Sequence, residues 1–408
     1  MTSLPLASRF DRARWREAAD WLAVGVAVSL PWSTSATSIL IVLWLIAVLP
    51  TLEVGALRRE LATAAGFLPV LLWALAAVGM LWADVSWAAR FGGLSSFHRL
   101  LLIPLLLVQF RRSAHGIRVL HGFIAAVLVL LLVSWGLAVV PGLPWRGKDF
   151  GVPVKDYIFQ STDFAICAFA LLGYACEAAR AQRWRWVAGH AALAALFLGN
   201  IFFVVTSRTV LFVAPVLLLL LGWREFRWKG LFGAALLGGV VGSAIWFSSP
   251  YLRDRVLTSS AEWQAYRTID AANSTGLRFE FLRKAVSFVE TAPIIGQGTG
   301  SIPEQFRRAA VGEGGASSAA PENPHNQILA VAIQLGLIGA AALTAMWIAH
   351  LLLFRSGGLT AWMGMIVVVQ NVVSSLFNSH LFDFTSGWLY VFGVGVVGGM
   401  LLRERDRA

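Results

Sequence analysis

One histidine and two arginines occupy positions where their side chains could carry out chemistry at a membrane surface. His325 follows Pro324 at the start of a long apolar segment, and a neutral imidazole can accept a proton from a hydroxyl group near neutral pH. Arg208 lies in a short connection between two apolar segments, and Arg278 lies in the first turn of a predicted helix. A guanidinium binds two phosphate oxygens at once, and a helix N-terminus favours an anion. These residues could therefore bind a pyrophosphate and move a proton beside it.

Each of the three residues also has a structural explanation that needs no ligand. Arg208 could keep its stem in lipid and extend its charged end to the interface. Arg278 could be a solvated first-turn arginine, and a lone histidine such as His325 is more often structural than catalytic. The residues alone leave both explanations open.

The elements that hold these residues are predicted to lie in a membrane. Of the 408 residues, 58% are hydrophobic and 13% are charged, and the mean hydropathy is +0.70. A soluble domain carries about 25% charged residues, so this chain cannot cover its apolar surface in water. The composition predicts an all-α polytopic membrane protein, and the net charge of +11 then reflects topology rather than nucleic-acid binding.

Apolar segments of the chain predict about twelve transmembrane helices, each of which needs roughly 20 residues to span a bilayer. Short loops on one side of this arrangement hold most of the Lys and Arg residues outside one long segment, so both termini are predicted to be cytoplasmic. Arg208 lies on the other side, against this bias, and a bound anion would explain it. The approximate cores of the spans are 20–34, 37–51, 66–83, 94–110, 119–140, 162–179, 187–206, 209–223, 230–248, 326–354, 359–378 and 387–402.

A long segment of mixed charge divides the chain into three predicted parts. These are an N-terminal transmembrane bundle (1–248), a large external loop domain (249–324) and a C-terminal transmembrane bundle (325–408). Within the loop, residues 273–291 have the capping residues and the apolar stripe of an amphipathic helix. We expect this helix to lie along the membrane surface.

Three glycines follow this helix at alternate positions, Gly296, Gly298 and Gly300. They resemble a phosphate-binding loop, but no strand precedes them and no Lys-Ser/Thr pair follows. A turn that re-enters the membrane surface is the better interpretation.

Several reaction classes lack their motifs in this sequence. It contains no His-Glu-x-x-His, no Cys/His cluster, no Gly-x-Ser-x-Gly and no external Asp-x-Asp. We therefore expect neither a metal nor another cofactor. No Lys, Arg, Asp or Glu falls near the middle of a predicted span, whereas ion-coupled transporters usually need such residues.

The motifs around His325 resemble those of the family of O-antigen ligases and O-antigen polymerases. The string PHNQIL at 324–329 is followed by QLGLIG at 334–339, and similar strings recur in that family. The string TSR at 206–208 resembles its arginine at a short external turn. The strings TGLR at 275–278 and GQG at 296–298 resemble its external-loop motif.

This resemblance implies a polytopic lipid-donor glycosyltransferase with a GT-C-like architecture in the bacterial inner membrane. Ligases of the family transfer O-antigen glycan from undecaprenyl pyrophosphate to lipid A-core on the periplasmic face, without metal or ATP. His325 would then be the base that activates the acceptor, and Arg208 and Arg278 would bind the phosphates. A single displacement would invert the anomeric centre. Further candidates for substrate binding are Asn326, Gln297, Arg146, Lys148 and His380.

Three other functions compete with a ligase. An O-antigen polymerase has the same donor but a second lipid-linked glycan as acceptor. A protein O-oligosaccharyltransferase has related motifs but tends to be longer. A flippase for lipid-linked oligosaccharide belongs to a different class, and it should have a polar tunnel through the middle of the membrane.

Overall fold

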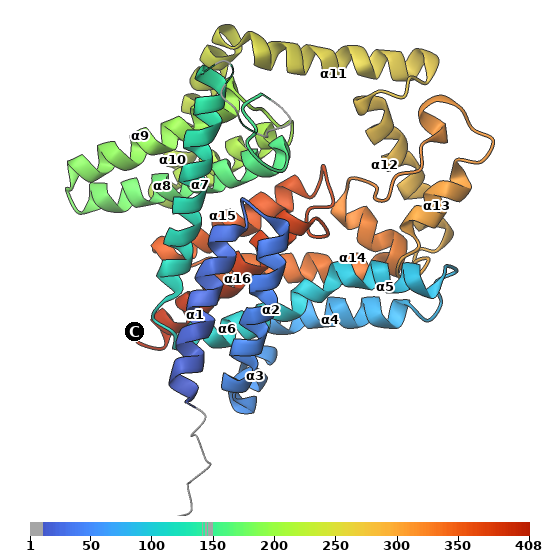
Figure 1. Cartoon of the computed structure of the whole chain (residues 1–408). Coiled ribbons are helices and arrows are strands. Elements are labelled where there is room, and N and C mark those ends of the chain that lie inside the picture. The colour runs from blue at the N-terminus through green and yellow to red at the C-terminus, as the bar shows by residue number, and fades with distance from the viewer. Residues whose placement is uncertain (1–10, 141, 143–144, 146–149) are drawn as a thin grey trace, which may run out of the picture.

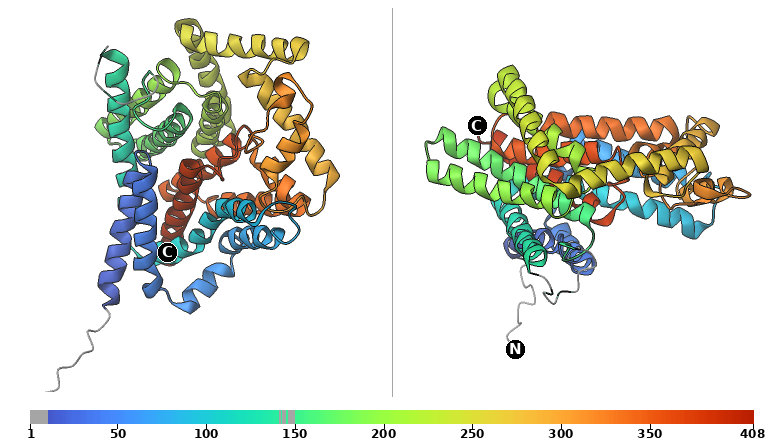
Figure 2. Two further views of the ribbon diagram at one scale, coloured as in Figure 1. Left: turned by 45° about the vertical axis from the view of Figure 1, so that its right-hand side comes forward. Right: turned by 90° about the horizontal axis from the view of Figure 1, so that it is seen from above.

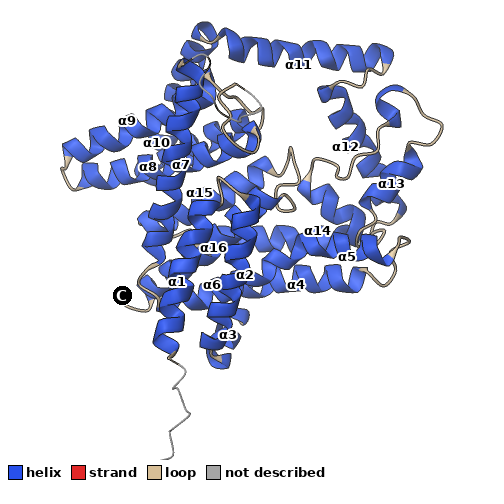
Figure 3. Cartoon of the chain, viewed as in Figure 1, coloured by secondary structure: helices blue, strands red, loops and turns tan. Residues whose placement is uncertain are grey.

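The computed structural model describes residues 11–140, 142, 145 and 150–408, which form helices and no strand (Figure 3). This confirms the prediction of an all-α polytopic membrane protein. The α-helices are α1 (Arg12–Ser29), α2 (Thr34–Val48), α3 (Val54–Leu61), α4 (Ala64–Gly79), α5 (Trp87–His98), α6 (Leu102–Arg112), α7 (Gly116–Val139), α8 (Tyr157–Arg180), α9 (Trp184–Phe203), α10 (Val210–Ser248), α11 (Pro250–Ile269), α12 (Ser274–Thr291), α13 (Ile302–Ala309), α14 (Gln327–Leu353), α15 (Leu359–Ser374) and α16 (Phe384–Arg405). Short 3-10 helices are η1 (Leu49–Thr51), η2 (Arg99–Leu101) and η3 (Gly315–Ser318).

The helices pack in three groups around a common centre. Helices α1, α2 and α7 form one group, α8, α9 and α10 a second, and α4, α5 and α14 a third (Figure 1 and Figure 2). Helices α6, α15 and α16 lie between them, and α11 crosses one end of the molecule from α10 to α12. Apolar side chains fill the space between the groups, including the fully buried Trp44, Phe110, Phe164 and Tyr390.

Every predicted span overlaps a helix, although fewer helices meet the requirements for crossing a membrane. By length and composition, 8 of the described helical segments could cross, or 9 if the bent pair Val54–Leu61 and Ala64–Gly79 forms one span. The count is below twelve because α1 carries several charges, α15 has only 16 residues, and α10 is counted once.

Helix α10 is a hairpin of two helices that turns at Arg227. Arg227 has φ 54° and ψ −134°, outside the helical region. In a straight helix Gly222 and Gly230 would be about 12 Å apart, yet a Cβ atom on Gly230 would lie 1.9 Å from the Gly222 carbonyl oxygen. The chain therefore reverses here, and the spans predicted at 209–223 and 230–248 are separate helices.

Ion pairs between the described residues join only groups that the charge bias assigned to the same side. On the side predicted to be cytoplasmic they include Arg16–Glu53, Arg112–Glu53, Arg111–Glu60, Arg111–Asp406, Arg180–Glu225 and Arg224–Glu177. On the opposite side they include Arg208–Glu262, Arg283–Glu280, Arg307–Glu304 and Arg308–Asp84. This separation agrees with the predicted threading of the chain.

Helix α14 is interrupted at Gly336, where φ is 64° and ψ is −162°. The interruption frees backbone groups that would otherwise bond within the helix, and the segment 293–298 pairs with them. A Cβ atom on Gly336 would lie 2.2 Å from the Ile294 carbonyl oxygen, and one on Gly296 would lie 2.5 Å from the Gln334 backbone. These glycines therefore serve close backbone packing and need no phosphate to explain them. The bonds run from the Gln297, Gly298 and Leu337 N–H groups to the carbonyl oxygens of Ile333 (2.7 Å), Gln334 (2.9 Å) and Pro293 (2.8 Å).

Helix α12 begins after Asn273, one of the predicted capping residues, and packs part of its apolar stripe on other helices. Asn273 accepts a hydrogen bond from the Gly276 N–H at 2.8 Å and so caps the helix. The stripe residues Phe281, Ala285 and Phe288 are buried against α13 and α14. These three residues therefore pack on protein, whereas Leu282 of the same stripe is 41% exposed, and the position of α12 at the membrane surface stays a prediction.

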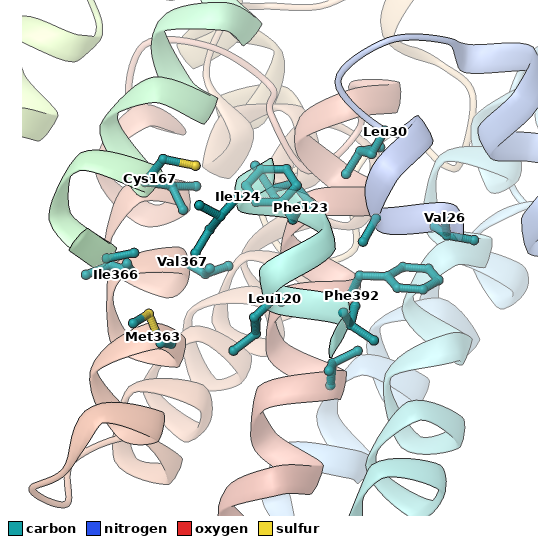
Figure 4. Close-up of a pocket in the computed structure, with 17 residues that line it drawn as sticks. Val26, Leu30, Leu120, Phe123, Ile124, Cys167, Met363, Ile366, Val367 and Phe392 are labelled. Carbon is teal, nitrogen blue, oxygen red and sulfur yellow. The ribbon is translucent and has the colours of Figure 1, made fainter. Parts of the chain in front are cut away.

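An apolar cavity lies among α1, α7, α8, α15 and α16 (Figure 4). Its volume is about 60 Å³, and Val26, Phe123, Cys167 and Phe392 are among the side chains that line it. Leu30 lies at one end, where its carbonyl oxygen accepts a hydrogen bond from the Lys155 ammonium.

Candidate functional site

The candidate site is built on the first turns of α12. Thr275, Arg278 and Phe281 are spaced three residues apart, so their side chains follow one face of the helix. The Asn273 side chain fixes the start of this face, because its amide also donates a hydrogen bond to the Glu262 carbonyl of α11 at 2.8 Å. Helix α12 is thereby held to α11 at its N-terminus.

Arg208 contacts this face of α12 by a hydrogen bond to Thr275. Its guanidinium donates to the Thr275 hydroxyl at 2.9 Å and to the Glu262 carboxylate at 3.1 Å. Thr275 also donates to Glu262. Burial raises the pKa of Glu262, but the hydrogen bonds from Thr275 and Arg208 outweigh that effect and hold the pKa below its usual value.

One donor of Arg208 remains for a ligand. Its Nε atom is buried and has no hydrogen-bond partner within the part of the chain that the structure describes. Buried donors are normally satisfied, so an unused N–H on a guanidinium beside a helix N-terminus is consistent with an anion site.

His325 lies further along the same face of α12. Its ring stacks on Phe281 with centroids 5.9 Å apart and planes 18° apart. Its backbone is left-handed, with φ 52°, a conformation that costs energy in a residue other than glycine and that occurs at functional sites as well as at turns. Asn323 supports this conformation by accepting a hydrogen bond from the His325 N–H at 3.0 Å.

Asn378 determines which nitrogen of His325 carries the proton. The Nδ1 atom lies 2.9 Å from Asn378 Oδ1, and the Ser379 N–H donates to this same oxygen at 3.1 Å. Since a backbone N–H can only donate, the Asn378 atom must be the carbonyl oxygen, so Nδ1 must be the donor. In the neutral ring the lone pair is then on Nε2, which is the arrangement that a general base requires.

The surroundings of His325 favour this neutral form. Burial lowers the pKa of His325 below its ordinary value, and the positive charge of Arg278 lowers it further. The hydrogen bond to Asn378 and the charge of Asp383 act in the opposite direction, but the net direction is downward. The imidazole is therefore a neutral proton acceptor at neutral pH.

The structure thus brings Arg208, Arg278 and His325 to one face of α12, although they are far apart in the sequence. Arg208 bonds to Thr275 and His325 stacks on Phe281, two positions that are about 9 Å apart along the helix axis. Arg278 lies between them. Two cations and a base therefore lie along one side of this helix, and their chemical roles remain a prediction.

The side chains of two further candidates, Asn326 and Gln297, make hydrogen bonds within the protein. Asn326 accepts from the Leu329 N–H at 3.0 Å, which caps α14, and donates to the Leu376 carbonyl at 3.1 Å. The Gln297 side chain donates to the Thr291 hydroxyl at 2.8 Å. Asn326 directly follows His325, whereas Thr291 is about 15 Å along the helix axis from Phe281. Substrate binding by Asn326 or Gln297 remains a prediction.

His380 is buried behind the site. Its side chain is fully buried, and its Nδ1 lies 3.2 Å from the Asp383 carboxylate. The loop that carries both residues is held by the buried Arg99, which donates to the carbonyl oxygens of Phe382 and Asp383. Direct contact between His380 and a substrate would require this loop to move.

The last two predicted substrate-binding residues lie in a part of the chain that the structure does not describe. Arg146 and Lys148 lie outside the described residues. Lys155, close by in the sequence, donates to the Leu30 carbonyl and to the Thr385 hydroxyl, so it joins the ends of α1 and α16.

Sequence reasoning missed the residues that organise the predicted ones. Asn378, Thr275 and Glu262 are polar side chains that hold His325 and Arg208 in place. Thr275 lies in the string TGLR, whereas Asn378 lies in no string that the sequence singled out, and their partners are 67 and 53 residues away. Only the tertiary structure pairs them.

The region that contains this site matches a known family. Residues 193–344, which include Arg208, α11, α12 and His325, match the family model described as O-antigen ligase. No curated protein matches the chain. The family acts in O-antigen and lipopolysaccharide biosynthesis through glycosyltransferase-like enzymes. Over residues 193–344, this multi-pass membrane protein is therefore similar to the O-antigen ligase family.

Proposed function

We propose that this protein is an O-antigen ligase that transfers a glycan from undecaprenyl pyrophosphate to lipid A-core. The reaction would occur on the periplasmic face of the bacterial inner membrane, without metal or ATP. The observation that carries this proposal is the meeting of Arg208, Arg278 and His325 on one face of α12, with the lone pair of His325 on Nε2.

The reaction follows from the chemistry of these groups. Nε2 of His325 removes the proton from an acceptor hydroxyl as its oxygen forms a bond to the anomeric carbon. The bond from this carbon to the pyrophosphate breaks, and the leaving group takes the bonding electrons. Arg208 and Arg278 offset the charge that develops on the pyrophosphate, and the imidazolium then gives its proton to water.

A single displacement of this kind inverts the anomeric configuration. A retaining mechanism would need a nucleophile to form a covalent intermediate, and Glu262, the carboxylate bonded to Arg208, is already engaged with Arg208 and Thr275. The product linkage should therefore have the opposite configuration from the donor, and nuclear magnetic resonance of the product checks this.

The apolar cavity would take part of the polyprenyl chain. Its end at Leu30 is joined through Lys155 to Thr385, and Thr385 is two residues from Asp383, whose charge acts on His325. Hydrogen bonds therefore run from the cavity to the start of α16, next to the loop that carries Asp383. Its lining is apolar, which suits a hydrocarbon chain.

The test uses purified protein with undecaprenyl-pyrophosphate glycan and lipid A-core, in the presence of chelator and without nucleotide. Glycan on lipid A-core would support a ligase. Lengthened lipid-linked glycan would instead identify a polymerase. Movement of the donor across a vesicle membrane without any transfer would identify a flippase and would refute the proposal.

A further inference from the structure

An exposed group of aromatic side chains adjoins the candidate site. Trp263 and Tyr266 of α11 and Phe279 of α12 contact one another, with ring centroids 4.2 Å apart for Trp263 and Phe279 and 5.7 Å for Trp263 and Tyr266. Phe279 is 44% exposed, and the other two rings are half-buried. We call these three residues the aromatic platform.

Charged and polar groups surround the aromatic platform. The Tyr266 hydroxyl donates to the Glu280 carboxylate at 3.0 Å, and Arg283 pairs with Glu280 at 2.6 Å. The Arg267 guanidinium lies 6.0 Å from the centre of the Trp263 ring. Hydrogen-bond donors and acceptors therefore lie around an apolar aromatic surface.

The aromatic platform lies next to the residues proposed to bind pyrophosphate along α11 and α12. Trp263 directly follows Glu262, which bonds to Arg208. Phe279 directly follows Arg278 and lies one helical turn after Thr275, the other partner of Arg208. A group attached to a pyrophosphate at Arg208 would therefore lie within reach of the platform.

We propose that the aromatic platform binds the pyranose rings of a glycan substrate. This rests on the proposed function and names the part of the protein that holds the sugar. The C–H face of a pyranose ring is apolar and stacks on an aromatic ring, while its hydroxyl groups hydrogen-bond to neighbouring charged side chains. Both requirements are present together at Trp263, Phe279 and the surrounding groups.

A lipid chain is a poorer occupant of this surface than a sugar. Hydrocarbon placed on Trp263 and Phe279 would remove water from Arg267 and Arg283 without offering hydrogen bonds, which is costly for charged groups. A sugar replaces that water with its own hydroxyl groups. The polar surroundings of the platform thus select a glycan.

The test measures binding of free glycans to the full-length protein in nanodiscs by saturation-transfer nuclear magnetic resonance and calorimetry. One arm uses the glycan released from the donor by mild acid, which lacks lipid and phosphate. The second arm uses the core oligosaccharide released from lipid A-core. Binding in the first arm alone assigns the platform to the donor glycan, and binding in the second alone assigns it to the acceptor.

We expect Trp263→Ala and Phe279→Ala each to weaken binding of the glycan by roughly tenfold, since each removes a stacking ring. Trp263→Phe keeps a ring and should bind within about threefold of wild type. Trp184→Ala is the matched control, because Trp184 is 63% exposed but lies away from this surface on α9. It should bind as wild type does.

The outcomes separate this proposal from the proposed function. Glycan binding that depends on Trp263, in a protein that transfers nothing, would support the platform and refute the ligase. Transfer in which Trp263→Ala keeps wild-type glycan affinity and KM would overturn the platform alone. Equal weakening by Trp263→Ala and Trp263→Phe, or by the Trp184 control, would also overturn it.

Discussion

Replacing Asn378 with leucine should slow glycan transfer by about 5- to 150-fold while leaving the protein folded. The substitution removes the acceptor that holds Nδ1–H of His325 at 2.9 Å. A half-buried N–H left without a partner costs about 1–3 kcal/mol, and each 1.36 kcal/mol is tenfold in rate. The loss should appear in kcat, because the hydrogen bond orients the base rather than binding substrate.

The pH dependence of this variant provides a second readout. Transfer needs neutral His325, so the rate falls as the pH drops below the pKa of His325. The bond to Asn378 raises this pKa, so its removal should lower the pKa and move the acid limb to lower pH. Asn378→Asp would supply a negative charge at the same place, so it should move the acid limb to higher pH.

The assay is transfer from undecaprenyl-pyrophosphate glycan to lipid A-core under saturating conditions, from pH 5 to pH 8. Leu376→Ala is the matched control, because Leu376 lies in the same loop and its side chain is 47% exposed. The reasoning is refuted if Asn378→Leu transfers within twofold of wild type, or if its acid limb stays in place.

Four further predictions follow from the same geometry. Arg278→Gln should lose about 100- to 1000-fold in kcat, and its acid limb should move to higher pH because Arg278 lowers the pKa of His325; a pH–rate profile checks both. Arg208→Lys should lose about 10- to 150-fold in transfer, because lysine keeps the charge but cannot bridge Thr275, Glu262 and a phosphate at once; equal rates would contradict this. Gly336→Ala should lower the free energy of unfolding by more than about 1 kcal/mol, because its Cβ would lie 2.2 Å from the Ile294 carbonyl oxygen at a φ of 64°. Gly357→Ala is the control. A Cβ atom there would have nothing within 4 Å, so the melting temperature should stay unchanged. Ala170→Leu fills part of the apolar cavity, so it should raise KM for the lipid donor and leave KM for the acceptor unchanged; an unchanged donor KM would place the polyprenyl chain elsewhere.

The sequence predicts the helices well where apolar length or capping chemistry defines them. Two apolar runs separated by charges predicted the two halves of α10, and the reversal at Arg227 agrees. Asn273 was among the predicted caps of α12. These features are local, so neighbouring residues are enough to determine them.

The sequence could not reveal the partners of these helices. The apolar stripe of α12 would look the same against lipid or protein, and the structure buries Phe281 and Phe288 on α13 and α14. The glycines after α12 looked like a turn, but their partner is the interruption of α14 at Gly336. Packing between distant segments decides both cases.

The same distinction applies to the candidate site. His325, Arg208 and Arg278 stood out because their residue types and positions are unusual beside a membrane. Asn378 did not, because an asparagine in a polar loop has many ordinary roles. Its importance depends on a bond to His325 across 53 residues, which no local pattern can indicate.

A double-mutant cycle on His325 and Arg278 tests the central claim most directly. The rate of transfer from undecaprenyl-pyrophosphate glycan to lipid A-core is measured for His325→Ala, Arg278→Ala and the double variant. We expect each single variant to lose at least about 100-fold and the double variant to lose little more than the worse single one, because residues that act as one unit are not additive. Wild-type transfer by either single variant, or losses that multiply in the double variant, would contradict a single site formed by these residues.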